Sequence, residues 1–151
     1  MAAPLDLEPV RPPATRMGIA LLALLGLLVA GYLALYKFGL LGTIQCTIGG
    51  CEKVQTSQWA TFLGLPVAAW GVGAYAVILV LALLGLQPRW VQSRGVALAL
   101  FGLALVGVAF SAWLTYLEAA VIHAWCQWCV ISAVLITLIF VLSIFGLRRA
   151  R

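Results

Sequence analysis

The stretch CQWCVISAVLITLIFVLSIFGL, residues 126–147, decides the fold. It carries no charge, and as an α-helix rising ~1.5 Å per residue it is long enough to cross a hydrocarbon layer of ~30 Å. Cys126 and Cys129 lie one helical turn apart where the run begins. A dithiol in this position can open and close as a disulfide. The stretch therefore predicts a membrane helix with a redox-active pair at one end.

The composition of the whole chain agrees with a membrane protein. Its 151 residues are 65% hydrophobic and 9% charged, with a mean hydropathy of +1.15. Soluble domains carry roughly a quarter charged residues. The net charge of +5 does not indicate nucleic-acid binding, because the basic residues lie between apolar runs and not along one face.

Four apolar runs predict four spans, at about 17–38, 66–86, 95–117 and 126–147, within a membrane domain of residues 17–147. The first run is longer than the ~7–15-residue core of a cleaved signal peptide and lacks a small-x-small cleavage site, which favours an anchor. Residues 1–16, rich in proline and charge, predict a disordered cytoplasmic tail. Residues 148–151 form a basic cytoplasmic tail.

Four spans place both termini on one side, and the Lys and Arg residues of short loops set the orientation. Seven arginines fall on the side of the termini: Arg11, Arg16, Arg89, Arg94, Arg148, Arg149 and Arg151. Only Lys37 and Lys53 fall on the other side. We therefore expect cytoplasmic termini, with loop 39–65, turn 118–125 and all four cysteines at an oxidising outer face. The short loops after the second and third spans favour a compact antiparallel bundle.

The outer loop, residues 39–65, interrupts the apolar pattern with glycines and polar residues. Gly49-Gly50 indicates a turn. From Glu52 to Phe62 there is neither glycine nor proline, and a weak apolar stripe predicts a short amphipathic helix on the membrane surface. An irregular loop is the alternative. The expected fold class is an all-α membrane protein, a four-transmembrane-helix bundle with this surface helix in its first outer loop.

The CxxC pair has two unlike sulfurs. Cys126 opens the fourth span, where the helix dipole favours a thiolate, and Cys129 lies one turn deeper, towards lipid. A purely structural Cys126–Cys129 disulfide is the alternative, but a disulfide that closes so small a ring constrains little of the unfolded chain. Haem attachment would need histidine where Val130 stands. A zinc site formed by the four cysteines is a further alternative, although zinc would block thiol exchange.

Cys46 and Cys51 flank Thr-Ile-Gly-Gly, whose two glycines allow the tight return that closes a small ring. An exposed disulfide in such a loop is easily reduced. Exchange could then run from a partner dithiol through the loop pair to the CxxC and on to a lipid-soluble two-electron acceptor. The hydroxyl of Ser57 could bind a quinone or a thiolate, or Ser57 is simply a polar residue on a wet helix face.

Aromatic residues gather near the expected outer face: Trp59, Trp70, Tyr116, Trp125 and Trp128. They could wall a quinone pocket, although interfacial tryptophans commonly form a membrane belt. The full set expected to contact the quinone is Cys129, Ser57, Trp59, Trp70, Ser111, Leu114 and Ile122. Glu118 and His123 could handle protons, or are ordinary interfacial polar residues.

With these residues placed, the sequence resembles the vitamin K epoxide reductase family, in its bacterial branch. The matching elements are Cys46-Thr-Ile-Gly-Gly-Cys51-Glu, Ser57, Gly64-Leu65-Pro66-Val67, Gly71, Tyr75 and Cys126-Gln-Trp-Cys129. They cover nearly the whole chain after the N-terminal tail. Two loop cysteines, a serine and a membrane CxxC over four spans form a specific set, whereas a CxxC alone does not.

The resemblance implies a four-helix bundle around a quinone, ubiquinone or menaquinone, with the surface helix as a lid. It implies that Cys51 exchanges with a thioredoxin-like or DsbA-like partner and that Cys46 passes electrons to Cys126. Cys129 would then reduce the quinone beside Ser57. The implied protein is a thiol oxidase of the bacterial cytoplasmic (inner) membrane that supports disulfide-bond formation.

The sequence departs from the family pattern in ways that bear on the alternative functions. The chain ends at Arg151 without a thioredoxin-like domain, so we expect a separate donor protein. Vertebrate members have an asparagine near the start of the second span, where Val67, Ala68 and Ala69 stand here, and a tyrosine where this chain has Ala133. Both differences weigh against vitamin K epoxide reduction, the enzymatic alternative. A non-catalytic scaffold stapled by disulfides is the alternative of another class.

Overall fold

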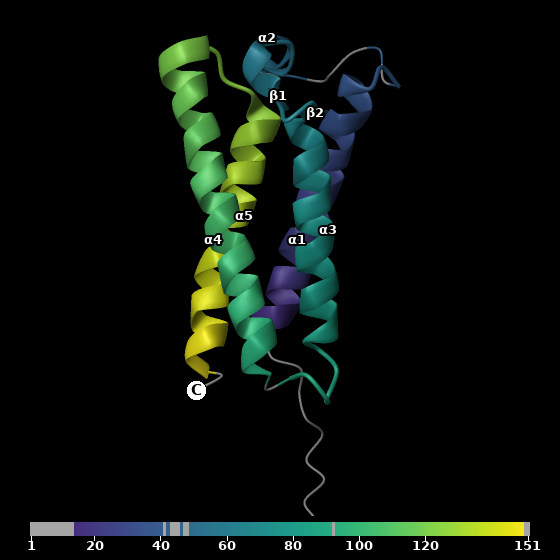
Figure 1. The fold of residues 1–151 in the computed structure, drawn as a ribbon, viewed down its shortest axis with the longest axis vertical. Coiled ribbons are helices and arrows are strands. Elements are labelled where there is room, and N and C mark those ends of the chain that lie inside the picture. Colours follow the sequence, from purple (N-terminus) through teal and green to yellow (C-terminus); the bar gives the residue numbers. More distant parts are fainter. Residues whose placement is uncertain (1–13, 41, 43–45, 47–48, 92, 150–151) are drawn as a thin grey trace, which may run out of the picture.

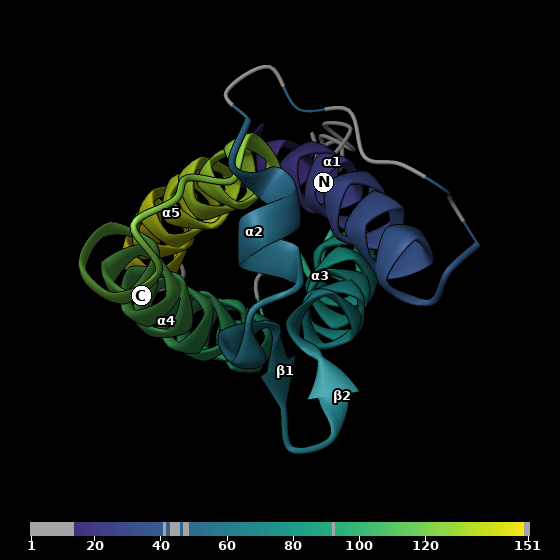
Figure 2. The same cartoon turned by 90° about the horizontal axis from the view of Figure 1, so that it is seen from above.

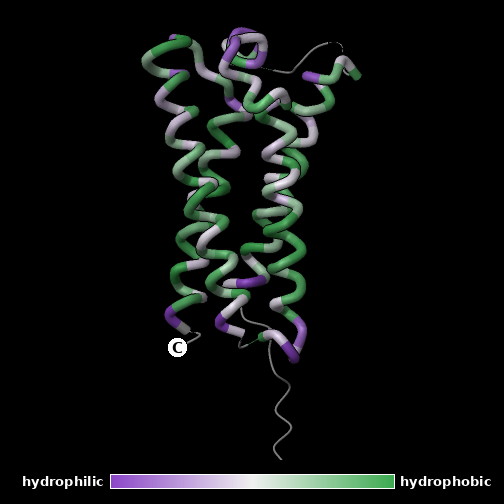
Figure 3. Tube along the Cα trace, viewed as in Figure 1, coloured by the Kyte–Doolittle hydropathy of each residue, from purple (hydrophilic) through white to green (hydrophobic). Residues whose placement is uncertain are grey.

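Four long helices stand side by side in the computed structural model, which describes residues 14–40, 42, 46, 49–91 and 93–149. They are α1 (Ala14–Lys37), α3 (Val67–Leu84), α4 (Arg94–Tyr116) and α5 (Gln127–Arg149) (Figure 1). All four are long and apolar enough to cross a membrane. Hydrophobic residues fill the middle of the bundle and hydrophilic ones gather at its ends (Figure 3). The predicted fold class, an all-α four-helix membrane bundle, is confirmed. Residues 1–13 of the expected tail lie outside the described residues.

Three of the helices extend beyond the bounds expected from sequence, and α5 does so by continuing to Arg149, into the expected basic tail. α1 begins at Ala14, so Arg16 belongs to the helix and not to the tail. α4 continues as a π-helix over Leu117–Ile122, where the sequence predicts a turn. His123 ends this helix with a left-handed backbone, φ 57°. The continuation buries Glu118, which is 3% exposed.

The helices follow the order α1, α3, α4, α5 around the bundle (Figure 2). α1 packs against α3 and α5, and α4 packs against α5, whereas α3 and α4 contact each other least. The fully buried side chains of Ile19, Ile78, Leu100 and Ile139 bring all four helices into one core. Several residues of this core, Ile78 among them, also line the cavity described below.

Gly26 allows the ring of Tyr75 to lie directly against α1. A Cβ atom at position 26 would come within 2.2 Å of Tyr75 Cε1. The Tyr75 hydroxyl donates to the Ser132 carbonyl at 2.9 Å and lies 2.8 Å from the Ser132 hydroxyl. One side chain thus links α1, α3 and α5, because a small residue lets two helices approach closely.

Arg16 secures the bundle at the end where α1 begins. Its guanidinium donates to the carbonyls of Gly85 and Trp90, both at 2.7 Å, and to that of Ser93 at 3.2 Å. These carbonyls belong to the connection between α3 and α4. The rigid fork of donors on arginine suits such a cluster, so the start of α1 and the α3–α4 connection are held together.

A cap of short elements covers the other end, which we call the cysteine end because all four cysteines lie there. It consists of α2 (Cys51–Gln55), the 3-10 turn Gln58–Ala60, and a hairpin of β1 (Thr61–Phe62) and β2 (Leu65–Pro66). Seen from above, α2 lies across the mouth of the bundle (Figure 2). Leu63 and Gly64 both have positive φ, 53° and 82°, as a tight two-residue hairpin turn requires.

The surface helix expected over Glu52–Phe62 is therefore shorter than predicted. The Thr56 hydroxyl donates to the Glu52 carbonyl at 2.6 Å, and Ser57 has an extended backbone, φ −71° and ψ 158°. Threonine and serine side chains compete with the backbone for hydrogen bonds. The chain consequently leaves the helix after Gln55 and folds back as the hairpin.

We expect Gly26→Ala to destabilise the bundle by about 1–3 kcal/mol, because the new methyl group would overlap the Tyr75 ring. Gly31→Ala in the same helix is the matched control, since nothing lies within 4 Å of its Cβ position. Thermal unfolding in detergent should give a lower midpoint for Gly26→Ala, and an unchanged or higher one for Gly31→Ala. Equal midpoints for the two variants would contradict the packing described here.

Candidate redox site

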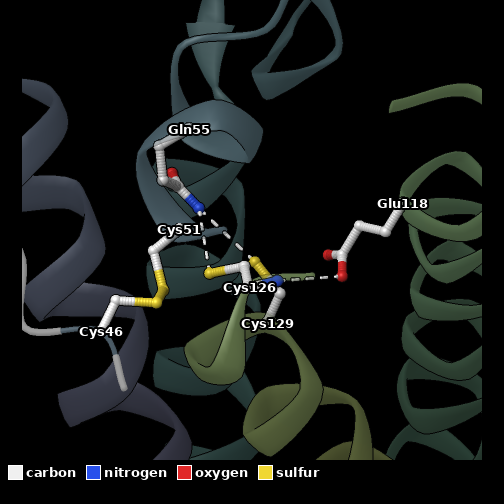
Figure 4. Close-up of a disulfide and its surroundings, with 6 residues drawn as sticks. All are labelled: Cys46, Cys51, Gln55, Glu118, Cys126 and Cys129. Atoms are coloured by element: carbon white, nitrogen blue, oxygen red, sulfur yellow. Dashed lines mark hydrogen bonds between the residues drawn. A yellow bond between two sulfur atoms is a disulfide. The ribbon is translucent and has the colours of Figure 1, made fainter. Parts of the chain in front are cut away.

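Both cysteine pairs meet under α2 (Figure 4). Cys46 and Cys51 form a disulfide, and Cys126 and Cys129 are free thiols. Cys51 and Cys126 are both 0% exposed and belong to one buried cluster with Leu33 and Val54. Cys46 is only half-buried. The loop disulfide therefore joins a fully buried cysteine to a half-buried one that packs against the same cluster.

Gly50 makes this contact between the cap and α5 sterically possible. A Cβ atom at position 50 would lie 2.3 Å from the carbonyl oxygen of Trp125 and 2.8 Å from its nitrogen. The Gly50 backbone is ordinary, with φ −102°, so glycine is needed for space and not for its conformational freedom. Because Gly50 precedes Cys51 and Trp125 precedes Cys126, this backbone contact sets the two cysteines beside each other.

Gln55 is a site residue that the sequence analysis did not identify. It follows Cys51 by one helical turn, so both side chains face the CxxC. Its amide nitrogen lies 3.4 Å from Cys129 Sγ and 3.8 Å from Cys126 Sγ (Figure 4). The Lys37 ammonium donates to the backbone carbonyl of Gln55 at 2.7 Å and holds the end of α2 over the bundle. An amide N–H aimed at sulfur favours a thiolate.

Hydrogen bonding lowers the pKa of Cys126 to about 7. The main cause is the bond from the Cys129 thiol, supported by the backbone N–H groups of Cys129 and Trp128 and by Gln55, while burial acts in the opposite direction. The two backbone donors belong to the first turn of α5, where N–H groups point out of the end of the helix. Near and above pH 7 Cys126 is therefore substantially thiolate, the form that exchanges disulfides.

Glu118 approaches the CxxC from the other side, on the π-helix that continues α4. Its carboxyl group accepts a hydrogen bond from the Cys126 N–H at 3.4 Å (Figure 4). It also lies beside the Cys129 thiol. Its spacing from Ser111 and Thr115 gives a polar stripe on an apolar helix, a signal for an inward position. His123, the other residue considered for proton transfer, is exposed and faces a separate hollow beside Lys53.

A cavity of about 340 Å³ lies inside the bundle beneath α2, within the range of small-molecule sites. All four long helices and the cap contribute to its largely apolar lining. The lining includes every residue expected to contact a quinone: Cys129, Ser57, Trp59, Trp70, Ser111, Leu114 and Ile122. Apolar walls with Ser57, Glu118 and the Cys129 sulfur towards the cysteine end suit a flat ring with polar oxygens. The quinone contacts themselves stay a prediction.

The aromatic residues near the cysteine end divide into two groups. Trp59 and Trp70 line the cavity, whereas among the described residues Tyr116, Trp125 and Trp128 do not. Phe62 of the hairpin, which sequence reasoning passed over, has its ring centroid 5.7 Å from Phe110 of α4 and 6.2 Å from Trp70 of α3. The hairpin thus covers the cavity where α3 and α4 contact each other least.

Two polar details bear on the expected site. The Ser57 hydroxyl donates to the Val54 carbonyl at 2.7 Å and reaches the cavity from the end of α2. Within the described ranges, no group of three or more His, Cys, Asp or Glu could hold a metal ion. A disulfide beside two free thiols is an arrangement in which exchange could occur.

A comparison with models of protein families gives a match. The model of the vitamin K epoxide reductase family matches residues 17–144. The matched region contains the four spans, the cap and both cysteine pairs, which is most of the chain.

Gly50→Ala should slow exchange between the loop pair and the CxxC by at least roughly tenfold, because its methyl group would push α2 away from Trp125. Gly42→Ala is the control, since nothing lies within 4 Å of its Cβ position. Mass spectrometry of alkylated protein, quenched at intervals after a pulse of reductant, gives the rate. Equal rates in the two variants would show that the Gly50–Trp125 contact does not set the distance.

The thiolate absorbance of the protein with a reduced CxxC should titrate with a midpoint of about pH 7. Because the pKa of Cys126 is lowered, the thiolate is present above about pH 7 and is lost as the pH falls through this value. Cys129→Ala should move the midpoint upwards, because it removes the main stabilising hydrogen bond. A midpoint that does not respond to this substitution would contradict the assignment.

Proposed function

The chain belongs to the vitamin K epoxide reductase family, and on that premise we propose that it is a thiol oxidase that moves electrons from an exported dithiol protein to a quinone. Membership makes it a membrane oxidoreductase with disulfide and quinone chemistry. The observation that carries the proposal is that the two cysteines of the CxxC lie in different surroundings. Cys126 is buried beside Cys51, while Cys129 lines the cavity.

The loop pair receives the electrons first. A donor thiolate attacks the half-buried Cys46, and Cys51 leaves as a thiolate. The second donor thiolate then displaces Cys46, so that the donor becomes a disulfide and both loop cysteines are reduced. This order differs from the one implied by the resemblance, in which Cys51 meets the donor, and the burial of Cys51, which is 0% exposed, supports it.

The loop pair then reduces the CxxC. The Cys51 thiolate attacks Cys126 of the Cys126–Cys129 disulfide, and Cys129 leaves as a thiolate facing the cavity. Cys46 next attacks Cys51, which restores the loop disulfide and leaves both CxxC sulfurs reduced. The resulting arrangement, a loop disulfide beside two free thiols, is the one observed.

A bound quinone supplies a two-electron, two-proton acceptor in the cavity. Cys129 is placed to deliver the electrons as the Cys126–Cys129 disulfide forms again. The Ser57 hydroxyl and the apolar walls would orient the ring, for ubiquinone or menaquinone alike. Closure by α2 and the hairpin excludes water, so the reduced pair is protected from other oxidants.

The placement of charge supports an orientation with cytoplasmic termini in a bacterial cytoplasmic membrane. Arg16, Arg89, Arg94 and Arg148 lie at the end away from the cysteines, whereas Lys37 and Lys53 lie at the cysteine end (Figure 1). Arginine and lysine favour the cytoplasmic side. The cysteines then face an oxidising compartment, where a separate thioredoxin-like donor can reach Cys46.

The proposal predicts that Cys126→Ala and Cys129→Ala each abolish quinone reduction by a reduced thioredoxin-like protein. Cys46→Ala and Cys51→Ala should abolish it with the protein donor, but should retain it with a small-molecule dithiol that reaches the CxxC directly. Loss of quinone absorbance in lipid nanodiscs measures both. Thr137→Ala, at an exposed position of α5, is the control.

Unchanged turnover in Cys129→Ala would refute the proposal. Turnover with vitamin K epoxide in place of quinone would favour epoxide reduction, the alternative activity. The same assay decides the order of exchange. Cys51→Ala should trap the donor as a mixed disulfide on Cys46. A donor trapped only on Cys51, in Cys46→Ala, would support the opposite order.

A further inference from the structure

The relay described above leaves Glu118 without a role. This carboxyl group is 3% exposed, lines the cavity, and contacts the CxxC through the Cys126 N–H at 3.4 Å. Its second contact is the Cys129 thiol. It therefore bridges the reacting sulfur and the space in which an acceptor would lie.

An ionisable residue on a membrane helix is costly, and its presence indicates a function by default. The helix is irregular at this point, since the π-helix Leu117–Ile122 turns Leu117 and Glu118 inward while Ala119 and Ala120 remain exposed. Such π-turns within helices occur frequently at functional sites. Glu118 thus faces inward at a local departure from ideal helix geometry.

The chemistry of the reduced pair requires a proton acceptor at this place. With Cys126 as the thiolate, Cys129 is a thiol, and its S–H bond must break when the Cys126–Cys129 disulfide forms. α2 lies across the mouth of the bundle (Figure 2), and Cys129 is half-buried beside the cavity. The Glu118 carboxyl group lies beside that thiol and lines the same cavity.

We propose that Glu118 is the catalytic base of the quinone step: it takes the proton of the Cys129 thiol and passes it to a quinone oxygen. The S–S bond forms, the Cys129 S–H bond breaks, and two electrons leave for the quinone. One proton is delivered by Glu118 and the second by water. This inference rests on the proposed function.

Glu118 could instead serve only as a cap, since its carboxyl group accepts the Cys126 N–H at the start of α5. The two roles separate in Glu118→Gln. The amide keeps an oxygen that accepts the same hydrogen bond, but it cannot take up a proton. Glu52→Gln, an exposed carboxyl group on α2 at the same end of the bundle, is the matched control for loss of charge.

The first measurement is single-turnover reduction of a short-chain quinone by the reduced full-length protein in nanodiscs. General-base catalysis contributes on the order of 10²-fold or more, so Glu118→Gln should be slower by roughly 10²-fold and Glu52→Gln should match the wild type. In Glu118→Ala, added formate should restore part of the rate. An unchanged rate in Glu118→Gln, or no rescue by formate, would overturn the inference.

The second measurement needs no quinone. The S–H stretching band of Cys129, assigned by its loss in Cys129→Ala, should lie at lower frequency in the wild type than in Glu118→Gln, because a carboxylate is the stronger acceptor. A band that does not move on this substitution would also overturn the inference. Failure of the wild type to reduce any quinone would instead refute the proposed function, and the band would still report whether Glu118 binds the thiol.

Discussion

The close contact between Gly50 and the backbone of Trp125 is the constraint on which the site depends. It joins two segments far apart in the sequence at the points that immediately precede Cys51 and Cys126. Any side chain at position 50 would meet the Trp125 carbonyl oxygen at 2.3 Å. This contact positions α2 so that Cys51 and Gln55, on one face of the helix, both reach the CxxC. Lys37 of α1 donates a hydrogen bond to the backbone carbonyl of Gln55 and so holds the end of α2.

The surrounding bundle places polar groups where they can be satisfied. In the part of the chain that the structure describes, no buried side-chain nitrogen or oxygen lacks a hydrogen-bond partner. Tyr75 bonds to Ser132, Arg16 to backbone carbonyls, and Glu118 to the CxxC. An unpaired polar group costs several kcal/mol in hydrocarbon, so these pairings explain how an apolar bundle can hold a polar site. The same bundle leaves α3 and α4 in limited contact, with the hairpin covering the cavity there.

The sequence predicted the features that membrane physics imposes. Apolar length gave the four helices, and the position of Cys126 at the start of an apolar run gave the CxxC at a helix end. Features that depend on local competition or tertiary contact were missed. Thr56 and Ser57 end α2 early. The π-helix occupies a segment whose sequence predicts a turn. The burial of Cys51 follows from the contact between Gly50 and Trp125. Glu118 was visible as a polar residue, and its spacing from Ser111 and Thr115 indicates an inward position, but the π-helix that continues α4 past it was not expected.

The central claim is that α2 holds Cys51, and not Cys46, against Cys126. The direct measurement is disulfide formation in two double variants oxidised in membranes and mapped by mass spectrometry. Cys46→Ala with Cys129→Ala leaves Cys51 and Cys126, which should join rapidly and nearly completely. Cys51→Ala with Cys129→Ala leaves Cys46 and Cys126, which should join slowly. Rapid joining of Cys46 to Cys126, with none between Cys51 and Cys126, would contradict the account.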